Sequence, residues 1–348
     1  MFSFRNCLLL MLLSLGNNLG AEGSRTPKLT ASPSPAPDPT LYYSSPPPLS
    51  PSNPPSFPSI SPSPSPAPPS QSLSSPPNDC SSPTLLWSDE FEGATLDTSS
   101  WNYFTGTAYN TELEYYTQRS ENVRLENGSL VIEARAEAYG GMNYTSARID
   151  TRLKRAFYPG ASVSGTIFSK IRLEARMKLP KGQGLWPAFW LAPNSQICDA
   201  CGPYGSWPYS GEIDIMEAIN DMTYAFGTVH YGGFMSNGQT FNNQGHFRPT
   251  SYNLALEWHL YAFEWSANQR WWYIDDVLYY TTHSHSLSDE GWWTSTQTTV
   301  PTGPNSPFDA PFYIIINLAV GGDWPGAPNA VTTFPSQLLV DYVRVMGY

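Results

Sequence analysis

The chain has 348 residues and a formal net charge of −11 at pH 7, and 40% of its residues are hydrophobic. This length suffices for one large folded domain with additional segments. A negative charge of this size argues against nucleic-acid binding, which needs a basic surface, and favours a neutral polymer as the partner.

Residues 1–20 have the pattern of a secretory signal peptide. Arg5 precedes an apolar run over residues 7–15, and the small residues Gly20 and Ala21 follow. The run is too short to span a bilayer, and no second run of suitable length follows. We therefore expect a soluble protein that is secreted, extracellular or cell-wall associated, with no membrane contact after signal cleavage. An uncleaved anchor is the alternative.

Residues 21–83 are dominated by proline and serine, including a Ser-Pro repeat over residues 61–66. The segment has too few large apolar side chains to form a core, and proline-rich chains extend as polyproline II. We expect a disordered linker, similar in composition to O-glycosylated stalks, with wall attachment as the alternative. The folded domain is predicted to span residues 84–348.

Three cysteines remain once a signal peptide is removed, namely Cys80, Cys198 and Cys201. Cys198 and Cys201 either close a small loop or one of them pairs with Cys80, and the sequence leaves this open. A redox or zinc pair is the alternative, but a βαβ setting and a second ligand pair are missing.

Two Asn-X-Ser/Thr patterns begin at Asn127 and Asn143. Such patterns accept N-linked glycans in secreted proteins. We therefore expect a glycoprotein in which both asparagines lie on exposed backbone.

From residue 84 onward, short aromatic-rich runs alternate with Gly, Pro, Asn and Asp, which is typical of an all-β domain. Residues 171–179 alternate apolar and charged side chains, so we expect a strand with one face in the core and one in water. Residues 270–280 predict a hairpin that turns at two aspartates. Residues 312–320 are apolar enough to be buried on both faces. Further candidate strands are residues 129–135 and 338–345. Together these strands predict a sandwich of two antiparallel sheets.

Residues 210–218 set three carboxylates on an otherwise apolar strand. Glu212 and Asp214 are two positions apart and share one face, while the isoleucines that follow them face the core. Glu217 lies five positions after Glu212, which would put it on the opposite face. One extra residue near Met216, a β-bulge, would turn Glu217 to the side of the other two.

Three carboxylates on one face suit the hydrolysis of a glycosidic bond. The retaining mechanism needs a nucleophilic carboxylate and a protonated carboxylic acid about 5–5.5 Å apart. A third carboxylate between them helps to separate their pKa values, because close like charges cannot all stay ionised. An acidic, water-facing edge strand is the alternative.

Aromatic side chains flank these carboxylates, in residues 182–193 and at Trp207. Flat aromatic faces pack against the C–H groups of sugar rings. We therefore predict that Trp186, Trp190 and Trp207 bind sugar, whereas Phe189 is expected in the core.

The sequence resembles glycoside hydrolase family 16, and within it the laminarinase-like endo-β-1,3-glucanases. The spacing Glu-x-Asp-x-x-Glu is the bulged form that these laminarinases share. The resemblance implies a β-jelly-roll with a concave substrate cleft over residues 84–348. It is carried by residues 87–91, 110–117, 145–149, 182–193, 211–217, 229–232, 317–326 and 340–345.

The resemblance also implies roles for individual residues. Glu212 would be the nucleophile, Glu217 the general acid and then base, and Asp214 the residue that tunes and positions them. For His230 a structural histidine is the alternative. The residues implied to line the glucan cleft are Asn110, Arg148, Trp186, Trp190, Trp207 and His230.

Some family members bind a structural calcium ion through an early Glu, a mid-chain carbonyl and a late Asp. Glu90, Gly128 and Asp341 occupy comparable positions, with no bound metal as the alternative. No organic cofactor is expected. Thr111 departs from the family by standing where a second Asn is usual. Residues 198–204 form an insertion that could reshape one end of the cleft.

The leading interpretation is a secreted, monomeric, retaining endo-glycosidase that hydrolyses β-1,3-glucan, either laminarin-like or in cell walls. One alternative is a glucan-recognition protein that binds without cutting. Such binders typically lack one or both glutamates, whereas Glu212 and Glu217 are present here. A wall-remodelling transglycosylase is the other alternative, and it would use the same carboxylates.

Overall fold

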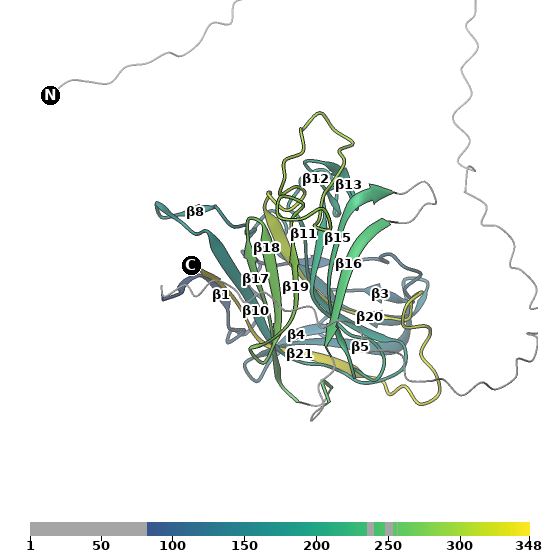
Figure 1. Ribbon diagram of the computed structural model, residues 1–348. Coiled ribbons are helices and arrows are strands. Elements are labelled where there is room, and N and C mark those ends of the chain that lie inside the picture. Colours follow the sequence, from purple (N-terminus) through teal and green to yellow (C-terminus); the bar gives the residue numbers. More distant parts are fainter. Residues whose placement is uncertain (1–81, 235–239, 248–252, 256) are drawn as a thin grey trace, which may run out of the picture. The chain divides into compact units, whose positions relative to one another are not determined.

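The computed structural model describes residues 82–234, 240–247, 253–255 and 257–348 (Figure 1). The predicted signal peptide, the Pro/Ser-rich segment up to residue 81 and Cys80 lie outside these residues. The described part of the chain consists of strands and loops and holds no helix that could cross a membrane.

Two sheets pack face to face as a β-jelly-roll sandwich (Figure 1). The larger, ten-stranded sheet has the order β19 (Val277–His283), β18 (Gln269–Ile274), β17 (His259–Ser266), β10 (Lys170–Lys178), β21 (Ser336–Gly347), β5 (Ser129–Tyr139), β6 (Met142–Ser146) and β3 (Glu114–Tyr116), with β1 (Thr84–Asp89) beside β21 and β4 (Val123–Glu126) beside β5. The seven-stranded sheet has the order β16 (Thr240–Phe247), β15 (Ala225–Phe234), β14 (Glu212–Glu217), β11 (Leu185–Pro193), β20 (Phe312–Val320), β7 (Arg148–Asp150) and β2 (Asn102–Phe104).

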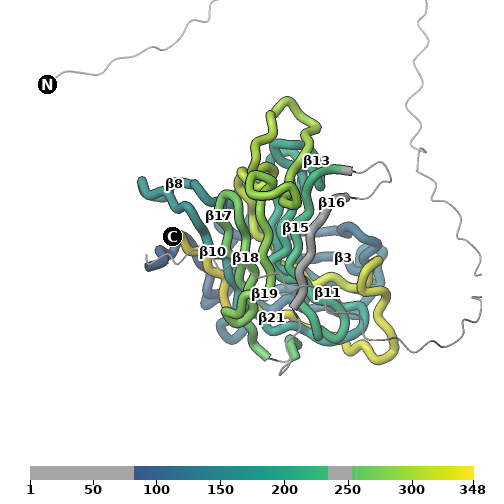
Figure 2. Tube along the Cα trace, viewed as in Figure 1, coloured from purple at the N-terminus to yellow at the C-terminus, as the bar shows by residue number. Residues whose placement is uncertain are grey.

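Almost all neighbouring strands in the described sheets are antiparallel, as expected, but β3 pairs with β6 in parallel. Two short hairpins lie outside the main sheets: β8 (Ser162–Val163) with β9 (Thr166–Ile167), and β12 (Cys201–Gly202) with β13 (Gly205–Ser206). The β8 hairpin projects from the sandwich, whereas β17, β18 and β19 lie side by side in Figure 2.

The core fills the space between the sheets. Apolar residues of both sheets join one buried cluster, and Trp265 of β17 meets Phe312 of β20 edge to face at 5.5 Å. The indole nitrogen of Trp272 donates a hydrogen bond to the backbone carbonyl of Asp214 at 2.8 Å. The larger sheet therefore directly supports the strand that carries the carboxylates.

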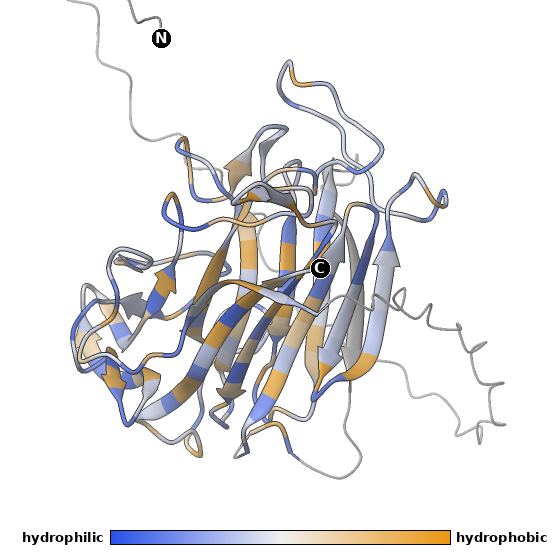
Figure 3. Ribbon diagram, turned by 90° about the vertical axis from the view of Figure 1, so that its left-hand side faces the viewer, coloured by the Kyte–Doolittle hydropathy of each residue, from blue (hydrophilic) through white to orange (hydrophobic). Residues whose placement is uncertain are grey.

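Hydrophobic and hydrophilic residues alternate along many of the strands (Figure 3), as period-two patterning requires. The hairpin predicted over residues 270–280 is confirmed as β18 and β19, and Asp275 and Asp276 have φ of 49° and 61°, as a type I′ turn needs. β20 is buried on both faces, as predicted.

The prediction for β10 is half right. Its apolar side chains face the core, and Arg176 and Lys178 on the other face are partly exposed. Arg172 and Glu174 on that face are only 8% exposed instead of lying in water, as is Lys170 just before the predicted strand. Lys170 pairs with Glu264 at 3.3 Å, and Arg172 pairs with Glu174 at 2.8 Å. β10 is central in its sheet, so side chains of neighbouring strands cover these charges and pair with them.

Candidate active site

The candidate site is a pocket of about 360 Å³ on the outer face of the seven-stranded sheet. Trp186, Ala188 and Trp190 of β11 line it, while the alternate residues Leu185 and Phe189 are fully buried in the core. The pocket floor extends from β14 across β11 and β20 to β7. Strand alternation thus separates the core from the pocket.

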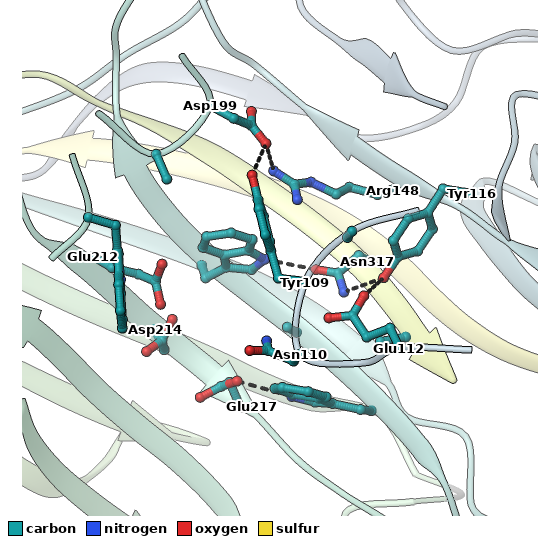
Figure 4. Close-up of a pocket in the computed structure, with 17 residues that line it drawn as sticks. Tyr109, Asn110, Glu112, Tyr116, Arg148, Asp199, Glu212, Asp214, Glu217 and Asn317 are labelled. Carbon is teal, nitrogen blue, oxygen red and sulfur yellow. Dashed lines mark hydrogen bonds and ion pairs between the residues drawn. The ribbon is translucent and has the colours of Figure 1, made fainter. Parts of the chain in front are cut away.

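A β-bulge in β14 brings the three carboxylates together, as the sequence predicts. Asp214 pairs with Trp190 and Met216 with Phe189, so Ile215 is the extra residue. Ile215 and Met216 both join the core cluster. Glu217 therefore returns to the pocket face, and Figure 4 shows it beside Glu212 and Asp214.

His230 and Trp186 contact the carboxylates directly. His230 lies opposite Glu212 on β15, with Nε2 3.3 Å from Asp214 Oδ2 and 3.6 Å from Glu212 Oε1. The indole nitrogen of Trp186 donates a hydrogen bond to Glu217 Oε1 at 3.0 Å. Both residues were predicted to bind sugar. The structure adds that they also set the environment of the carboxylates.

Burial raises the pKa of Glu212, Asp214 and Glu217, each to about 8. The negative charge of Asp214 adds to the rise at both glutamates, because a nearby like charge disfavours ionisation. The charge of His230 lowers the pKa of both glutamates. The Arg148 cation also lowers the pKa of Glu212, and the hydrogen bond from the neutral N–H of Trp186 lowers the pKa of Glu217. The negative charge of Glu217 opposes the effect of Arg148 by raising the pKa of Glu212, so the two glutamates keep similar pKa values of about 8.

The other predicted sugar-binding residues also meet in the pocket. Asn110, Arg148, Trp190 and Trp207 line it together with Trp186, whereas His230 contacts the carboxylates from the neighbouring strand β15. The guanidinium of Arg148 lies over the Trp190 ring, 5.1 Å from its centre. The pocket thus combines aromatic faces with hydrogen-bonding groups, as sugar binding requires.

Several pocket residues were not assigned from the sequence. Tyr116 donates a hydrogen bond to Glu112, and Asn317 links Tyr116 to the indole of Trp190. The signal was present, because these residues lie within stretches that carry the family resemblance. Their roles depend on contacts between distant strands. The unassigned lining residues include Tyr109, Glu112, Tyr116, Asp199 and Asn317.

The insertion at residues 198–204 reaches the pocket, as the sequence suggested. A disulfide joins Cys198 to Cys201, which confirms the small closed loop. Asp199 and Ala200 of this loop line the pocket. Thr111, the other departure, donates a hydrogen bond to Asp323 at 2.7 Å, which ties its loop to the segment after β20.

The predicted calcium ligands do not fit a cation in this structure. Both carboxylate oxygens of Glu90 accept hydrogen bonds from Arg344, at 3.0 and 2.7 Å. Asp341 accepts one from Arg176 at 2.8 Å, and the carboxylate next to Gly128 belongs to Glu92. Guanidinium groups thus balance the two charges that calcium would need. The calcium site stays a prediction without structural support.

Comparisons with known proteins identify similar chains. The sequence model of the glycosyl hydrolases family 16 matches residues 111–334. A "Beta-glucanase" of Rhodothermus marinus is 40% identical over 270 residues, which cover 75% of this chain and 84% of that protein. A "Glucan endo-1,3-beta-glucosidase A1" of Niallia circulans is 36% identical, and the match covers 75% of this chain but 37% of that longer protein.

Solved structures agree with the sequence comparisons. The X-ray structure of the laminarinase from Rhodothermus marinus matches with a TM-score of 0.62 and 37% sequence identity. The match covers 76% of this chain and 98% of that one. The likeness therefore extends over nearly the whole of that chain.

Proposed function

The chain belongs to glycosyl hydrolase family 16, and we propose that it is a retaining endo-glucanase that hydrolyses β-1,3 bonds in a neutral glucan. The observation that carries the proposal is the row formed by Glu212, Asp214 and Glu217 on one face of β14, in an aromatic pocket. A glycoside hydrolase needs a nucleophile and an acid at such a place.

Each carboxyl takes one role in this mechanism. The Glu212 carboxylate attacks the anomeric carbon, and Glu217 donates its proton to the leaving glycosidic oxygen. A covalent glycosyl–enzyme ester forms as the old bond breaks. Glu217 then removes a proton from water, which hydrolyses the ester and restores Glu212. His230 contacts both Glu212 and Asp214 through Nε2 and so helps to position Glu212.

The charges in the pocket favour a neutral substrate. Its lining residues include five carboxyl groups and a single cation, Arg148. Arg148 is already paired with Asp199 at 2.9 Å. A sulfated polysaccharide would therefore find no unpaired cation among these lining residues to balance its sulfate groups. A neutral glucan such as laminarin needs no such cation.

We propose further that residues 1–20 direct the protein to secretion and that residues 21–83 act as a spacer. Support comes from the described acceptor sites. Asn127 and Asn143 are both exposed, as glycosylation would require. Expression in a eukaryotic secretory host checks this, since we expect a protein in the medium whose mass falls on N-glycan removal. Full-length protein retained in cells would contradict it.

The test of the function is Glu212→Ala. Loss of the nucleophile should lower the release of reducing ends from laminarin by at least about a thousand-fold, while binding of laminarin survives. Near-normal turnover would remove Glu212 as nucleophile. If the wild type bound laminarin without cutting it, the recognition-protein alternative would hold.

Two further measurements define the reaction. NMR of the first product should show the β-anomer, and initial α-anomer would exclude the retaining route.

A panel of laminarin, mixed-linkage glucan, xyloglucan and carrageenan should show cleavage of the neutral β-1,3-linked glucans. Product sizing on the same panel separates hydrolysis from transglycosylation, because transfer to sugar yields oligosaccharides longer than the substrate.

A further inference from the structure

A hydrogen bond between Tyr109 and Asp199 joins two loops that lie at opposite ends of β20. The hydroxyl of Tyr109 donates to Asp199 Oδ2 at 3.3 Å. Tyr109 belongs to the loop between β2 and β3. That loop runs beside the last residue of β20, where Leu113 bonds the carbonyl of Val320 and Glu112 pairs with Gly321.

Asp199 belongs to the disulfide loop, which lies at the first residues of β20. The backbone nitrogen of Asn194 donates to the carbonyl of Pro311 at 2.8 Å. The hydroxyl of Tyr313, near the start of β20, is 2.7 Å from the backbone oxygen of Asp199 and 3.0 Å from Oδ1. The two loops that this bond joins thus approach each other along the direction of β20.

This direction crosses the pocket, because the pocket floor runs from β14 across β11 and β20 to β7. Figure 4 shows the ring of Tyr109 standing between Glu212 on one side and Arg148 and Tyr116 on the other. β14 and β20 are two strand positions apart, roughly 10 Å at the usual spacing. A sugar chain that leaves the carboxylates toward β7 meets the bridge after this short distance.

The two halves of the bridge are held unequally. Asp199 is fixed by Arg148 at 2.9 Å, by Tyr313, and by the disulfide between Cys198 and Cys201. Tyr109 is 52% exposed, and its hydroxyl bonds Asp199. Asp199 is thus the rigid half of the bridge. Removing the Tyr109 side chain should therefore open the pocket at this point.

We propose that the Tyr109–Asp199 bridge ends the sugar-binding part of the cleft on the β20 side of the carboxylates and so limits the length of the products. The inference rests on the proposed glucanase activity and deepens it. It makes Tyr109 and Asp199 specificity-determining residues for a neutral β-linked glucan. It also gives the inserted disulfide loop a function.

The test compares the full chain with Tyr109→Phe and Tyr109→Ala on β-1,3-gluco-oligosaccharides of increasing length. In the wild type, kcat/KM should stop rising at a short chain length. In Tyr109→Ala it should rise further by about five-fold for at least one more sugar unit, which corresponds to about 1 kcal/mol. Laminarin products should become longer. Tyr109→Phe, which loses only the hydroxyl, should shift in the same direction by less.

A double variant, Cys198→Ser with Cys201→Ser, tests the Asp199 half of the bridge. Freeing the loop that holds Asp199 should lengthen the products as Tyr109→Ala does. Tyr139→Phe is the matched control, because Tyr139 is 40% exposed on β5 and lies outside the pocket residues. Its length profile should follow the wild type.

The proposed role of the bridge is wrong if two length profiles, those of Tyr109→Ala and of the double cysteine variant, both superimpose on that of the wild type. Such a result would leave the glucanase activity intact. If the wild type cleaves no glucan, the proposed function fails instead, so the two failures are distinguishable.

Discussion

At the scale of single residues, the site depends on how each carboxyl is held. Glu217 has its own neutral donor, the indole nitrogen of Trp186, at 3.0 Å. Burial raises the pKa of Glu217 to about 8, and this hydrogen bond opposes the rise by stabilising the ionised form. The general acid is thereby kept protonated at neutral pH and still able to release its proton.

Replacing Trp186 by Phe should move the alkaline limb of the pH–kcat/KM profile upward. Without the N–H donor the ionised form of Glu217 is less stable, so its pKa rises by roughly half to one unit. Profiles between pH 5 and pH 10 measure the shift. Trp324→Phe is the control, because Trp324 packs edge to face on Trp186 at 5.4 Å without bonding Glu217. An unmoved limb in Trp186→Phe would exclude this role.

At the scale of elements, β14 is positioned at its start as well as by its bulge. Gly211, directly before Glu212, has φ of +83°, and a Cβ added there would lie 2.6 Å from the Phe308 ring. A left-handed conformation favours glycine, and a rigid buried ring cannot move aside cheaply. The absence of a side chain at Gly211 therefore allows the start of β14 to pack directly on the Phe308 ring.

We expect Gly211→Ala to lower the free energy of unfolding by about 2–4 kcal/mol and to reduce kcat. The cost combines backbone strain with the clash against Phe308. Gly141→Ala is a close control, because Gly141 has φ of +87° but nothing within 4 Å of an added Cβ. Urea unfolding of both variants isolates the clash. Equal losses in the two would show that packing under Gly211 contributes nothing.

At the scale of the whole molecule, the buried carboxyls couple stability to pH. Burial raises the pKa of Asp214 from 3.8 to about 8. Between these values the folded protein keeps a proton that the unfolded chain has lost. Stability from this group is therefore complete below about pH 4 and is lost as the pH rises through about 8.

The free energy of unfolding should accordingly fall from pH 5 to pH 8, with up to about 1.4 kcal/mol per pH unit from Asp214. Asp214→Asn should make this slope shallower, because the amide has no proton to lose, while Glu212 and Glu217 still contribute to it. Urea unfolding at several pH values provides the measurement. Asp289→Asn makes the same chemical change at an exposed position and should keep the wild-type slope. A slope unchanged in Asp214→Asn would refute the burial argument.

Much of the fold and of the site could be predicted because the signals are local. The continuous apolar run over residues 312–320 predicted β20, and the two aspartates within residues 270–280 predicted the turn of the β18–β19 hairpin. The odd spacing from Glu212 to Glu217 required a bulge, and the extra residue is Ile215. The exposure of Arg172 and Glu174 on the outer face of β10 was predicted wrongly, because alternation shows which face a side chain lies on but not what covers that face.

The sequence by itself determined the strand pattern, the carboxylate cluster and the aromatic pocket residues, because each follows from spacing within one short stretch. Only the tertiary structure decided which partners those residues meet. Asp199 lies 90 positions from Tyr109 and 51 from Arg148, yet it bonds both. Arg344 neutralises Glu90 across 254 positions. Such pairs depend on sheet order and register, which bring distant segments together and which no local pattern encodes.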